Sequence, residues 1–207
     1  MLANKQELFG VIRHYNPWWT GARPPDLPKW RRAVFSEIAQ WIDAPPAGRA
    51  LLLTGARQVG KTTVFLQAVE RLLDSGVHPS NIFYATFDHP LLKLAGVETV
   101  LSTWLEFEPP AEGPRYLFLD EVQIIKDWQV WLKQQVDFEK SNRIAVTGSA
   151  MPLDAQSSES GVGRWQTIKL PTLSFYEYLQ IRDIPTPGLP APSSLRQLFQ
   201  WDETQFQ

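Results

Sequence analysis

Apolar and polar residues alternate along this chain with two different periods, one typical of helices and the other of buried strands. Apolar residues at helical spacing predict helices over residues 30–42, 62–75, 97–105 and 128–138. Short, nearly continuous apolar runs predict five strands, at residues 50–54, 81–87, 116–119, 143–147 and 165–170. Because strands and helices alternate, we expect an α/β fold in which a mostly parallel sheet is covered by helices on both faces.

Proline-rich stretches lie at both ends of this pattern. Four prolines between positions 17 and 28 interrupt the first thirty residues, so we expect residues 1–29 to form an irregular N-terminal arm. The core is then expected at residues 30–182, ending with a short helix that a capping-box sequence opens at Ser174 and Glu177. We expect residues 183–207 to form a proline-rich linker and the start of a C-terminal module absent from this chain.

The composition narrows the class of protein. The 207 residues carry 20 Lys and Arg against 22 Asp and Glu, a formal net charge of −2, which excludes a globally basic nucleic-acid coater. The lack of cysteine excludes disulfides and thiolate metal sites, and three scattered histidines argue against a zinc centre. No apolar run exceeds four residues and the N-terminus lacks the apolar core of a secretory signal, so we expect a cytoplasmic protein without a membrane span.

The strongest chemical signal lies between the first strand and the second helix, where the sequence fits the phosphate-loop pattern G-x-x-x-x-G-K-[ST]. Glycines let such a loop turn its N–H groups toward phosphate oxygens, and the helix N-terminus favours the negative charge. Lys61 should reach the β- and γ-phosphates, and the Thr62 hydroxyl should bind Mg²⁺. The positions expected to contact the nucleotide are Gly55, Ala56, Arg57, Gln58, Val59, Gly60, Lys61, Thr62 and Thr63.

An acidic pair and two hydroxyl residues follow two later strands. Asp120 ends an apolar strand and is expected to hold Mg²⁺, while Glu121 would orient and polarise an attacking water. Thr147 and Ser149 follow the next strand, where they could hydrogen-bond the γ-phosphate or that water. Hydroxyl residues also follow strands in ordinary loops, so Thr147 and Ser149 have two interpretations, a contact with the γ-phosphate or the water and a purely structural one.

Three further features have both a functional and a purely structural interpretation. Arg164 precedes the last strand and could stabilise charge on a neighbouring subunit's γ-phosphate, or could be an ordinary salt-bridged arginine. Arg57, within the phosphate loop, is the alternative candidate for the charge-stabilising role. Residues 1–35 hold six Lys and Arg against two acidic residues. With Trp18 and Trp19, this segment could bind nucleic acid through charge and stacking, or the tryptophans could pack the arm onto the domain.

Taken in order, these residues resemble the AAA+ class of ATPases, and more narrowly prokaryotic ATP-binding proteins whose AAA domain precedes a C-terminal domain of unknown function. The matching stretches cover roughly residues 15–180. They are Asn16-Pro-Trp-Trp19, residues 55–63, Phe87-Asp88, Leu119-Asp-Glu-Val-Gln123 with Trp128, Thr147-Gly-Ser149, Gly163-Arg164, and Leu170-Pro-Thr-Leu-Ser-Phe175 with Glu177.

The resemblance implies a three-layer P-loop NTPase with a five-stranded sheet of order 5-1-4-3-2, and it implies ATP and Mg²⁺ as ligands. It assigns the phosphate loop to Lys61 and Thr62 and the acidic motif to Asp120 and Glu121. Thr147 or Ser149 would then be the sensor, and Arg164 would be an arginine finger at the edge of a homo-oligomer. Proteins of this kind continue with a lid and a further domain.

Three hypotheses follow for the function. The leading one is an ATPase core that binds and hydrolyses Mg-ATP and couples the cycle to movement or assembly of a partner domain. The second is a nucleotide-gated switch or scaffold with little turnover, and the third is a DNA-dependent ATPase or repair factor. A GTPase is disfavoured because no Asn-Lys-x-Asp motif follows the phosphate loop.

Overall fold

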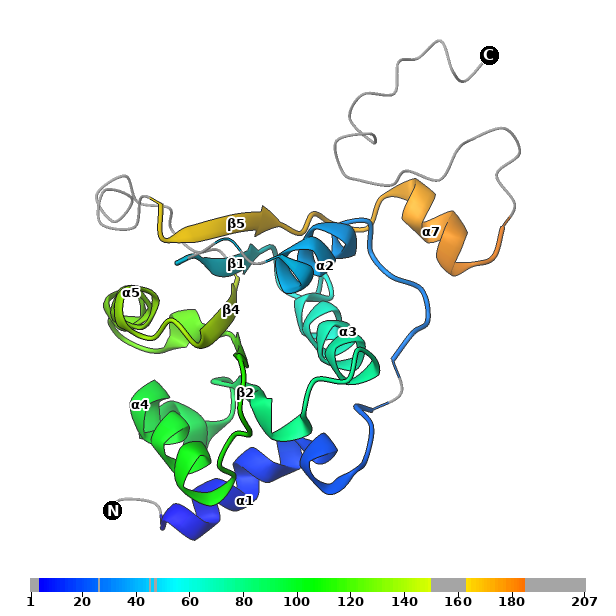
Figure 1. The fold of residues 1–207 in the computed structure, drawn as a ribbon. Helices are drawn as coiled ribbons and strands as arrows, with labels where there is room; N and C mark the ends of the chain where they lie inside the picture. Colours follow the sequence, from blue (N-terminus) through cyan, green and yellow to red (C-terminus); the bar gives the residue numbers. More distant parts are fainter. Residues whose placement is uncertain (1–3, 26, 45, 47, 150–162, 185–207) are drawn as a thin grey trace.

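The computed structural model describes residues 4–25, 27–44, 46, 48–149 and 163–184. Five strands form one parallel sheet in the order β2-β3-β4-β1-β5 (Figure 1). Read from the other edge, this is the expected order 5-1-4-3-2, so the predicted fold class is confirmed. The strands are β1 (Ala50–Thr54), β2 (Ile82–Thr86), β3 (Arg115–Asp120), β4 (Asn142–Gly148) and β5 (Trp165–Lys169).

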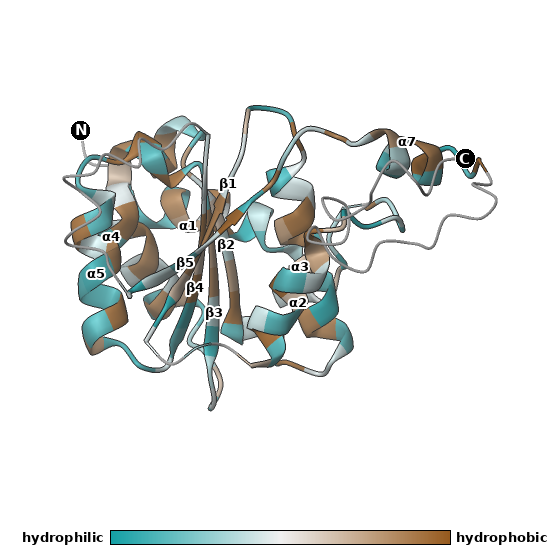
Figure 2. Ribbon diagram, turned by 90° about the horizontal axis from the view of Figure 1, so that it is seen from above, coloured by the Kyte–Doolittle hydropathy of each residue, from teal (hydrophilic) through white to brown (hydrophobic). Residues whose placement is uncertain are grey.

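Helices cover both faces of the sheet and produce three layers (Figure 2). On one face lie α1 (Lys5–Tyr15), α4 (Pro90–Phe107) and α5 (Trp128–Phe138). On the other lie α2 (Phe35–Asp43) and α3 (Lys61–Asp74). Three short 3₁₀ helices, η1 (Pro17–Thr20), η2 (Pro79–Asn81) and η3 (Val122–Ile124), join these elements, and α7 (Phe175–Ile181) follows β5.

Two hydrophobic cores lie on the two faces of the sheet. In β1, Leu51 and Leu53 pack with α2 and α3, whereas Ala50 and Leu52 belong to the core beneath α4 and α5. Both sets are buried, because a parallel strand covered on both faces has no solvent side. The near-continuous apolar runs that predict the strands are a consequence of this double burial.

Two helices differ from their predicted bounds. Residues 30–34 are not helical, because tertiary hydrogen bonds use their backbone: Gln67 donates to the Trp30 carbonyl, and the Ala33 N–H donates to Glu177. Helix α2 therefore begins only at Phe35. Helix α4 is longer than predicted and is interrupted at Gly96, whose φ of 77° lies outside the helical region.

The expectation of an irregular N-terminal arm is wrong for the residues that fold into α1 and η1. Residues 4–20 cover β2, the strand at one edge of the sheet. The buried Asn16 side chain accepts from the Tyr84 N–H at 2.7 Å and donates to the Tyr84 carbonyl at 2.8 Å. The indole N–H groups of Trp18 and Trp19 both donate to the Ile82 carbonyl. The N-terminal segment thus satisfies backbone groups that a bare edge strand would expose.

A buried ion pair fastens α7 to the rest of the domain. Arg32 donates from Nε to Glu177 Oε1 at 2.9 Å, and both side chains are less than a tenth exposed. The same guanidinium donates to the carbonyls of Val59, in the loop before α3, and of Pro171, after β5. Glu177 also completes the predicted capping box with Ser174. One arginine therefore joins the segment before α2, the loop before α3 and the start of α7.

Within these described ranges, no helix has both the length and the hydropathy needed to cross a membrane. Most of the predicted proline-rich linker, residues 185–207, lies outside the residues that the structure describes.

Replacing the edge-capping asparagine should destabilise the domain. Asn16→Ala removes three buried hydrogen bonds, including one to the Ile12 carbonyl, and leaves the Tyr84 backbone without partners. We expect the free energy of unfolding to fall by about 3 kcal/mol in urea denaturation. Asn4→Ala, the same change at the exposed N-cap of α1, should cost about 1 kcal/mol or less. Equal losses in the two variants would contradict the edge-capping role.

The Arg32–Glu177 pair should make stability depend on pH in the acid range. Burial raises the pKa of Glu177, but hydrogen bonds from Arg32 and from the Ser174 and Ala33 backbone outweigh it, and the pKa falls below its ordinary value of 4.5. A depressed pKa stabilises the fold above the unfolded-state pKa and loses that contribution as the pH falls through the folded-state value. The stability advantage of wild type over Glu177→Gln should therefore be constant between pH 7 and about pH 5.5 and shrink below 4.5. An advantage unchanged at pH 3.5 in urea unfolding would contradict this.

Candidate nucleotide-binding site

The carboxyl ends of β1, β3 and β4 meet at one edge of the sheet and bring the three sequence motifs together. Residues 55–60 connect β1 to α3, Asp120 ends β3, and Thr147 lies near the end of β4. Since all the strands are parallel, side chains that follow different strands converge at this edge. The order β3-β4-β1 places the acidic and hydroxyl motifs beside the loop.

The loop between β1 and α3 needs its glycines for two different reasons. A Cβ on Gly55 would lie 2.5 Å from the Leu170 carbonyl oxygen, so only glycine allows the backbone to pass so close to the end of β5. Gly60 has a φ of 98°, which directs the chain into α3, and Gln58 also has a positive φ of 63°. The close approach to Leu170 at Gly55 and the positive φ at Gly60 therefore fix the backbone path at the two ends of the loop.

Lys61 lies at the first position of α3 and is 4% exposed. Its Nζ donates to the carbonyls of Gly55 and Ala56 at 3.2 and 3.0 Å and lies 3.6 Å from Glu121 Oε1. The ammonium group is thus held over the loop by weak acceptors and one carboxylate, and phosphate oxygens can replace the carbonyls as its partners.

Asp120 is 2% exposed and accepts hydrogen bonds from three different elements. Thr62 Oγ1 donates to its Oδ2 at 2.5 Å, the Tyr84 hydroxyl donates to the same oxygen at 3.0 Å, and Thr147 Oγ1 donates to Oδ1. Burial, followed by the charge and hydrogen bond of Asp120, raises the pKa of Tyr84 well above its ordinary range. Tyr84 therefore stays protonated and remains a donor to the carboxylate.

Glu121 has a left-handed backbone, with a φ of 53°, and its side chain is 22% exposed. Its N–H donates to Thr147 Oγ1 at 3.0 Å. Its Oε2 accepts from Gln123 Nε2 and from Ser149 Oγ, the latter at 3.2 Å, and Gln123 also donates to Ser149. The carboxylate is therefore oriented by side chains after β3 and β4. The Oε1 atom of Gln123 is buried without a hydrogen-bond partner.

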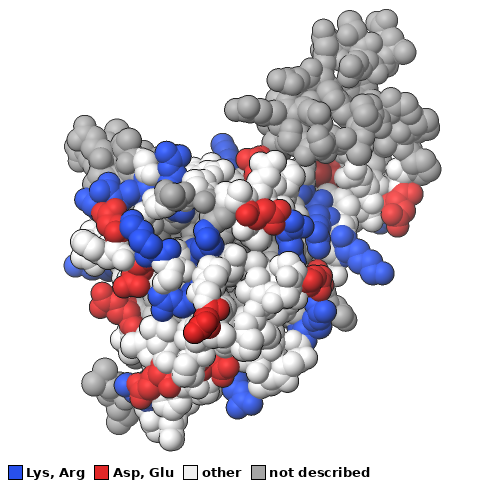
Figure 3. Space-filling model, viewed as in Figure 1, with Lys and Arg blue, Asp and Glu red and all other residues white. Residues whose placement is uncertain are grey.

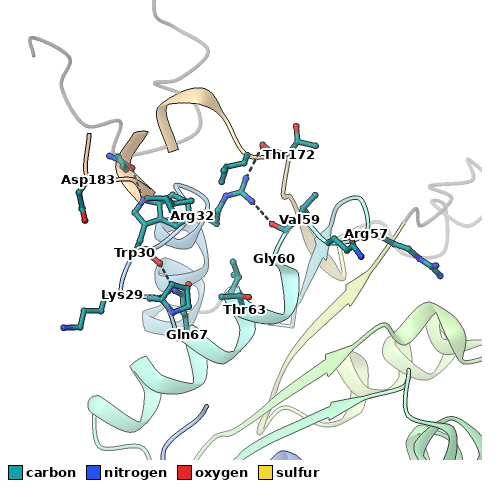
Figure 4. Close-up of a pocket in the computed structure, with 16 residues that line it drawn as sticks. Lys29, Trp30, Arg32, Arg57, Val59, Gly60, Thr63, Gln67, Thr172 and Asp183 are labelled. Atoms are coloured by element: carbon teal, nitrogen blue, oxygen red, sulfur yellow. Dashed lines mark hydrogen bonds between the residues drawn. The ribbon is translucent and has the colours of Figure 1, made fainter. Parts of the chain in front are cut away.

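A cavity of about 1050 Å³ adjoins the loop on the α7 side (Figure 4). Trp30, Arg32 and Gln67 line it together with Val59 and Gly60 of the loop and Thr63 of α3. Its volume is at the upper end for small-molecule sites and is ample for a base and ribose beside the phosphates. Figure 4 shows Arg57, also a lining residue, extending away from Trp30 and Arg32.

The structure separates Arg164 from the other predicted site residues. Its carbonyl accepts from the Ala50 N–H at the start of β1, while the phosphate loop follows the end of that strand. Five residues of strand put about 17 Å between the two ends. The Arg164 guanidinium forms an ion pair with Asp137 at 2.9 Å. Arg164 therefore cannot reach the phosphate loop of its own chain.

Three residues of the site carry no assigned role at the level of sequence. The sequence holds a local signal for Gln123, which lies two residues after Glu121 in the Asp-Glu-Val-Gln run. Tyr84 lies within an aromatic strand and Arg32 within a basic segment, and neither pattern distinguishes them from their neighbours. Their partners, Asp120 and Glu177, are 36 and 145 residues away in the chain.

The residues present fit a magnesium–nucleotide complex. The loop offers backbone N–H groups at a helix start and a buried ammonium, which suit phosphate oxygens. Thr62 and Asp120 offer hydroxyl and carboxylate oxygens, the atom types that Mg²⁺ prefers. Because Mg²⁺ usually keeps several waters and takes few protein ligands, the phosphates would supply the remaining oxygens.

The chain is similar to a known protein in sequence and to several solved structures in fold. An uncharacterized protein of Haemophilus influenzae is 28% identical over 138 residues, which are 64% of this chain and 34% of that protein. The chain thus spans about a third of this relative's length. The solved structures include AMPPCP-bound DnaA from Aquifex aeolicus, at 14% identity and a TM-score of 0.50 over 80% of this chain and 52% of that one. They also include C. elegans PCH-2, at 18% identity and a TM-score of 0.44 over 72% and 42%.

The family model described as AAA domain matches residues 47–179. That range contains the phosphate loop, the acidic pair, the hydroxyl pair and Arg164, and it covers more than half of the chain. The likeness to DnaA agrees with the fold. Membership in this family supports nucleotide binding. The chain therefore belongs to the AAA domain family and contains an AAA+ P-loop ATPase domain.

Proposed function

We propose that this domain binds Mg-ATP at the loop before α3, hydrolyses it, and couples the cycle to movement or assembly of a partner domain. One observation carries the proposal: the ends of β1, β3 and β4 bring the three motifs into contact. Lys61 pairs with Glu121, Thr62 donates to Asp120, and the Glu121 N–H donates to Thr147. A buried ammonium, a magnesium-type oxygen pair and an oriented second carboxylate are the groups that phosphoryl transfer to water needs.

The binding step uses the loop and the start of α3. Lys61 would exchange the Gly55 and Ala56 carbonyls for phosphate oxygens, which are stronger acceptors. Thr62 and Asp120 would hold Mg²⁺, which neutralises charge on the phosphates when bound. The cavity lined by Trp30, Val59 and Thr63 would receive the base and ribose.

The hydrolytic step uses Glu121. Its carboxylate would orient and polarise a water, and Gln123 and Ser149 would hold it in position. Thr147 hydrogen-bonds both Asp120 and the Glu121 N–H, so it would link the metal-binding and water-orienting residues. In this proposal Thr147 and Ser149 are the groups that respond to the γ-phosphate.

A nucleotide-gated switch with little turnover is the second candidate. The observation that favours it is the engagement of both Glu121 oxygens: Oε2 accepts from Gln123 and Ser149, and Oε1 lies 3.6 Å from Lys61 Nζ. If Glu121 kept these contacts after nucleotide binding, its carboxylate would stay turned toward Lys61, Gln123 and Ser149 rather than toward an attacking water. Binding would then change the conformation of the domain without consuming ATP.

The contacts of the N-terminal segment argue against a DNA-binding role for it. Trp18 is 2% exposed, and the indole N–H groups of Trp18 and Trp19 are bonded to β2. Four of the six Lys and Arg in residues 1–35 form ion pairs with acidic residues elsewhere in the fold. The segment therefore offers few unpaired charges, and the indole N–H groups of its two partly exposed tryptophans, Trp19 and Trp30, already donate to Ile82 and Gln180.

Glu121→Gln should stop hydrolysis while preserving nucleotide binding. The amide keeps the size of the side chain but cannot accept a proton, so steady-state phosphate release should fall at least about 100-fold. ATP affinity should change by less than about threefold, because Lys61 and the loop are intact. Glu7→Gln, the same change on the exposed surface of α1, serves as the control.

Each outcome of that comparison separates the candidates. Equal turnover in wild type and Glu121→Gln would remove Glu121 from the mechanism. Absent turnover in both, together with a change in mass on adding a non-hydrolysable ATP analogue, would favour the switch.

If Arg164 acts on nucleotide, it must act on that of a second copy of the chain. We expect Arg164→Ala to bind ATP normally and to lose most turnover, and Lys61→Ala to lose binding. Mixing the two inactive variants should restore part of the turnover, since each supplies what the other lacks. Arg13→Ala, on the exposed surface of α1, should leave turnover unchanged. No recovery on mixing would contradict a role for Arg164 between subunits.

A further inference from the structure

The amino edge of the sheet, opposite the phosphate loop, carries three arginines in one transverse row. Leu51 pairs with Ala145, so Arg49 and Arg143, each two residues earlier, lie side by side on neighbouring strands. Ala50 pairs with Trp165, which places Arg164 on the other side of Arg49. Neighbouring strands are about 4.8 Å apart, so the three backbones hold these positive charges close together.

The acidic groups near this row are already paired. Asp137 binds Arg164 and Glu139 binds Arg115. Among the described residues, neither Arg49 nor Arg143 has a carboxylate within 4 Å, and Lys140 donates only to the Val136 carbonyl. Figure 3 shows several Lys and Arg side chains on the side of the molecule where α5 and the starts of β1 and β5 lie, with Asp and Glu side chains among them. Arg49, Lys140 and Arg143 therefore form a positive cluster in which none of the three makes an ion pair with a carboxylate of the described residues, although Asp137 and Glu139 lie nearby.

A cavity of about 270 Å³ lies at this cluster. Arg49, Lys140 and Arg143 line it, together with Trp41 of α2, Asn142 of β4 and the paired Glu139. Two buried donors among these residues, Arg143 Nε and Trp41 Nε1, have no hydrogen-bond partner. The buried acceptor Asn142 Oδ1 also has none. Trp41 is 2% exposed. Buried donors without acceptors are uncommon in folded proteins, and either water or a bound group with acceptor oxygens would satisfy them.

We propose that this cavity is a second anion site that takes a phosphoryl group. Its three cations and two unsatisfied donors match a group with several acceptor oxygens, and guanidinium forks bind phosphate oxygens in pairs. A hydroxyl of a singly protonated free phosphate could donate to Asn142 Oδ1, a contact that the phosphodiester of a nucleic-acid backbone cannot make. The volume holds a phosphoryl group but is below the range typical of pockets that enclose drug-sized molecules. The phosphoryl group can come from free phosphate or from a nucleic-acid backbone.

The site is independent of the proposed ATPase function. It lies at the other end of β1 from the phosphate loop, about 17 Å away, and shares no residue with it. Lys61→Ala therefore removes the main cation of the loop without touching the amino edge. This variant is the background in which the second site can be measured alone.

The test titrates inorganic phosphate into the full chain carrying Lys61→Ala, at constant ionic strength set with chloride, and follows binding by calorimetry. Arg49→Gln and Arg143→Gln, each added to this background, should weaken phosphate binding at least tenfold. Arg143→Lys keeps the charge but lacks the Nε donor and should also weaken it. Arg13→Gln, on the exposed surface of α1, removes the same charge elsewhere and should have no effect. Urea unfolding checks that each variant is folded.

A second titration distinguishes the two sources. A fluorescent single-stranded oligonucleotide of twenty thymidines is added to the same variants, and its anisotropy is followed. Loss of either phosphate or oligonucleotide binding in both Arg49→Gln and Arg143→Gln, with Arg13→Gln unaffected, supports the site and identifies the source. The proposal is overturned if neither phosphate nor the oligonucleotide binds the Lys61→Ala protein. It is also overturned if each probe that binds does so equally well in all folded variants.

Discussion

The buried carboxylate of Asp120 holds the functional edge of this domain together. It ends β3 and accepts hydrogen bonds from Thr62 of α3, Thr147 of β4 and Tyr84 of β2. A carboxylate that is 2% exposed is costly to bury unless donors surround it, and here three elements supply them. The same contacts fix the distance between the phosphate loop and Glu121, because Thr147 also accepts from the Glu121 N–H. Structural stability and the geometry of the candidate site thus depend on one network.

Two further networks extend this arrangement to the ends of the described chain. Asn16 and the two neighbouring tryptophans attach the N-terminal segment to the edge strand β2, where free backbone groups would otherwise invite pairing with other chains. Arg32 attaches α7 to the phosphate loop through Glu177 and the Val59 carbonyl. A movement of the loop on nucleotide binding would therefore shift Arg32 and, through it, the position of α7, the last described helix.

The sheet has two chemically different edges. The carboxyl edge gathers acidic and hydroxyl side chains around Lys61, and the amino edge gathers arginines from the starts of β1, β4 and β5. Parallel pairing produces both, since residues at equal positions along each strand form transverse rows. In the sequence, Arg49, Arg143 and Arg164 are isolated basic residues, and only the strand order reveals that they are neighbours.

The local pattern by itself determined the five strands, the helices α3 and α5, the capping box at Ser174 and the phosphate loop. Each of these depends on residues close in the chain: double burial makes strands apolar, and glycines are needed where the loop passes Leu170 or turns into α3. Residues 5–15 also carry a local helix signal that the expectation of an irregular arm overlooked, since Asn4 caps α1 and Leu8, Val11, Ile12 and Tyr15 lie at helical spacing. Tertiary structure decided that so short a helix is stable, through its packing against α4 and β2. It likewise decided the partners of Tyr84, Arg32 and Gln123, and the distance of Arg164 from the loop. These contacts join residues far apart in sequence, and no local pattern encodes which buried donor will meet which acceptor.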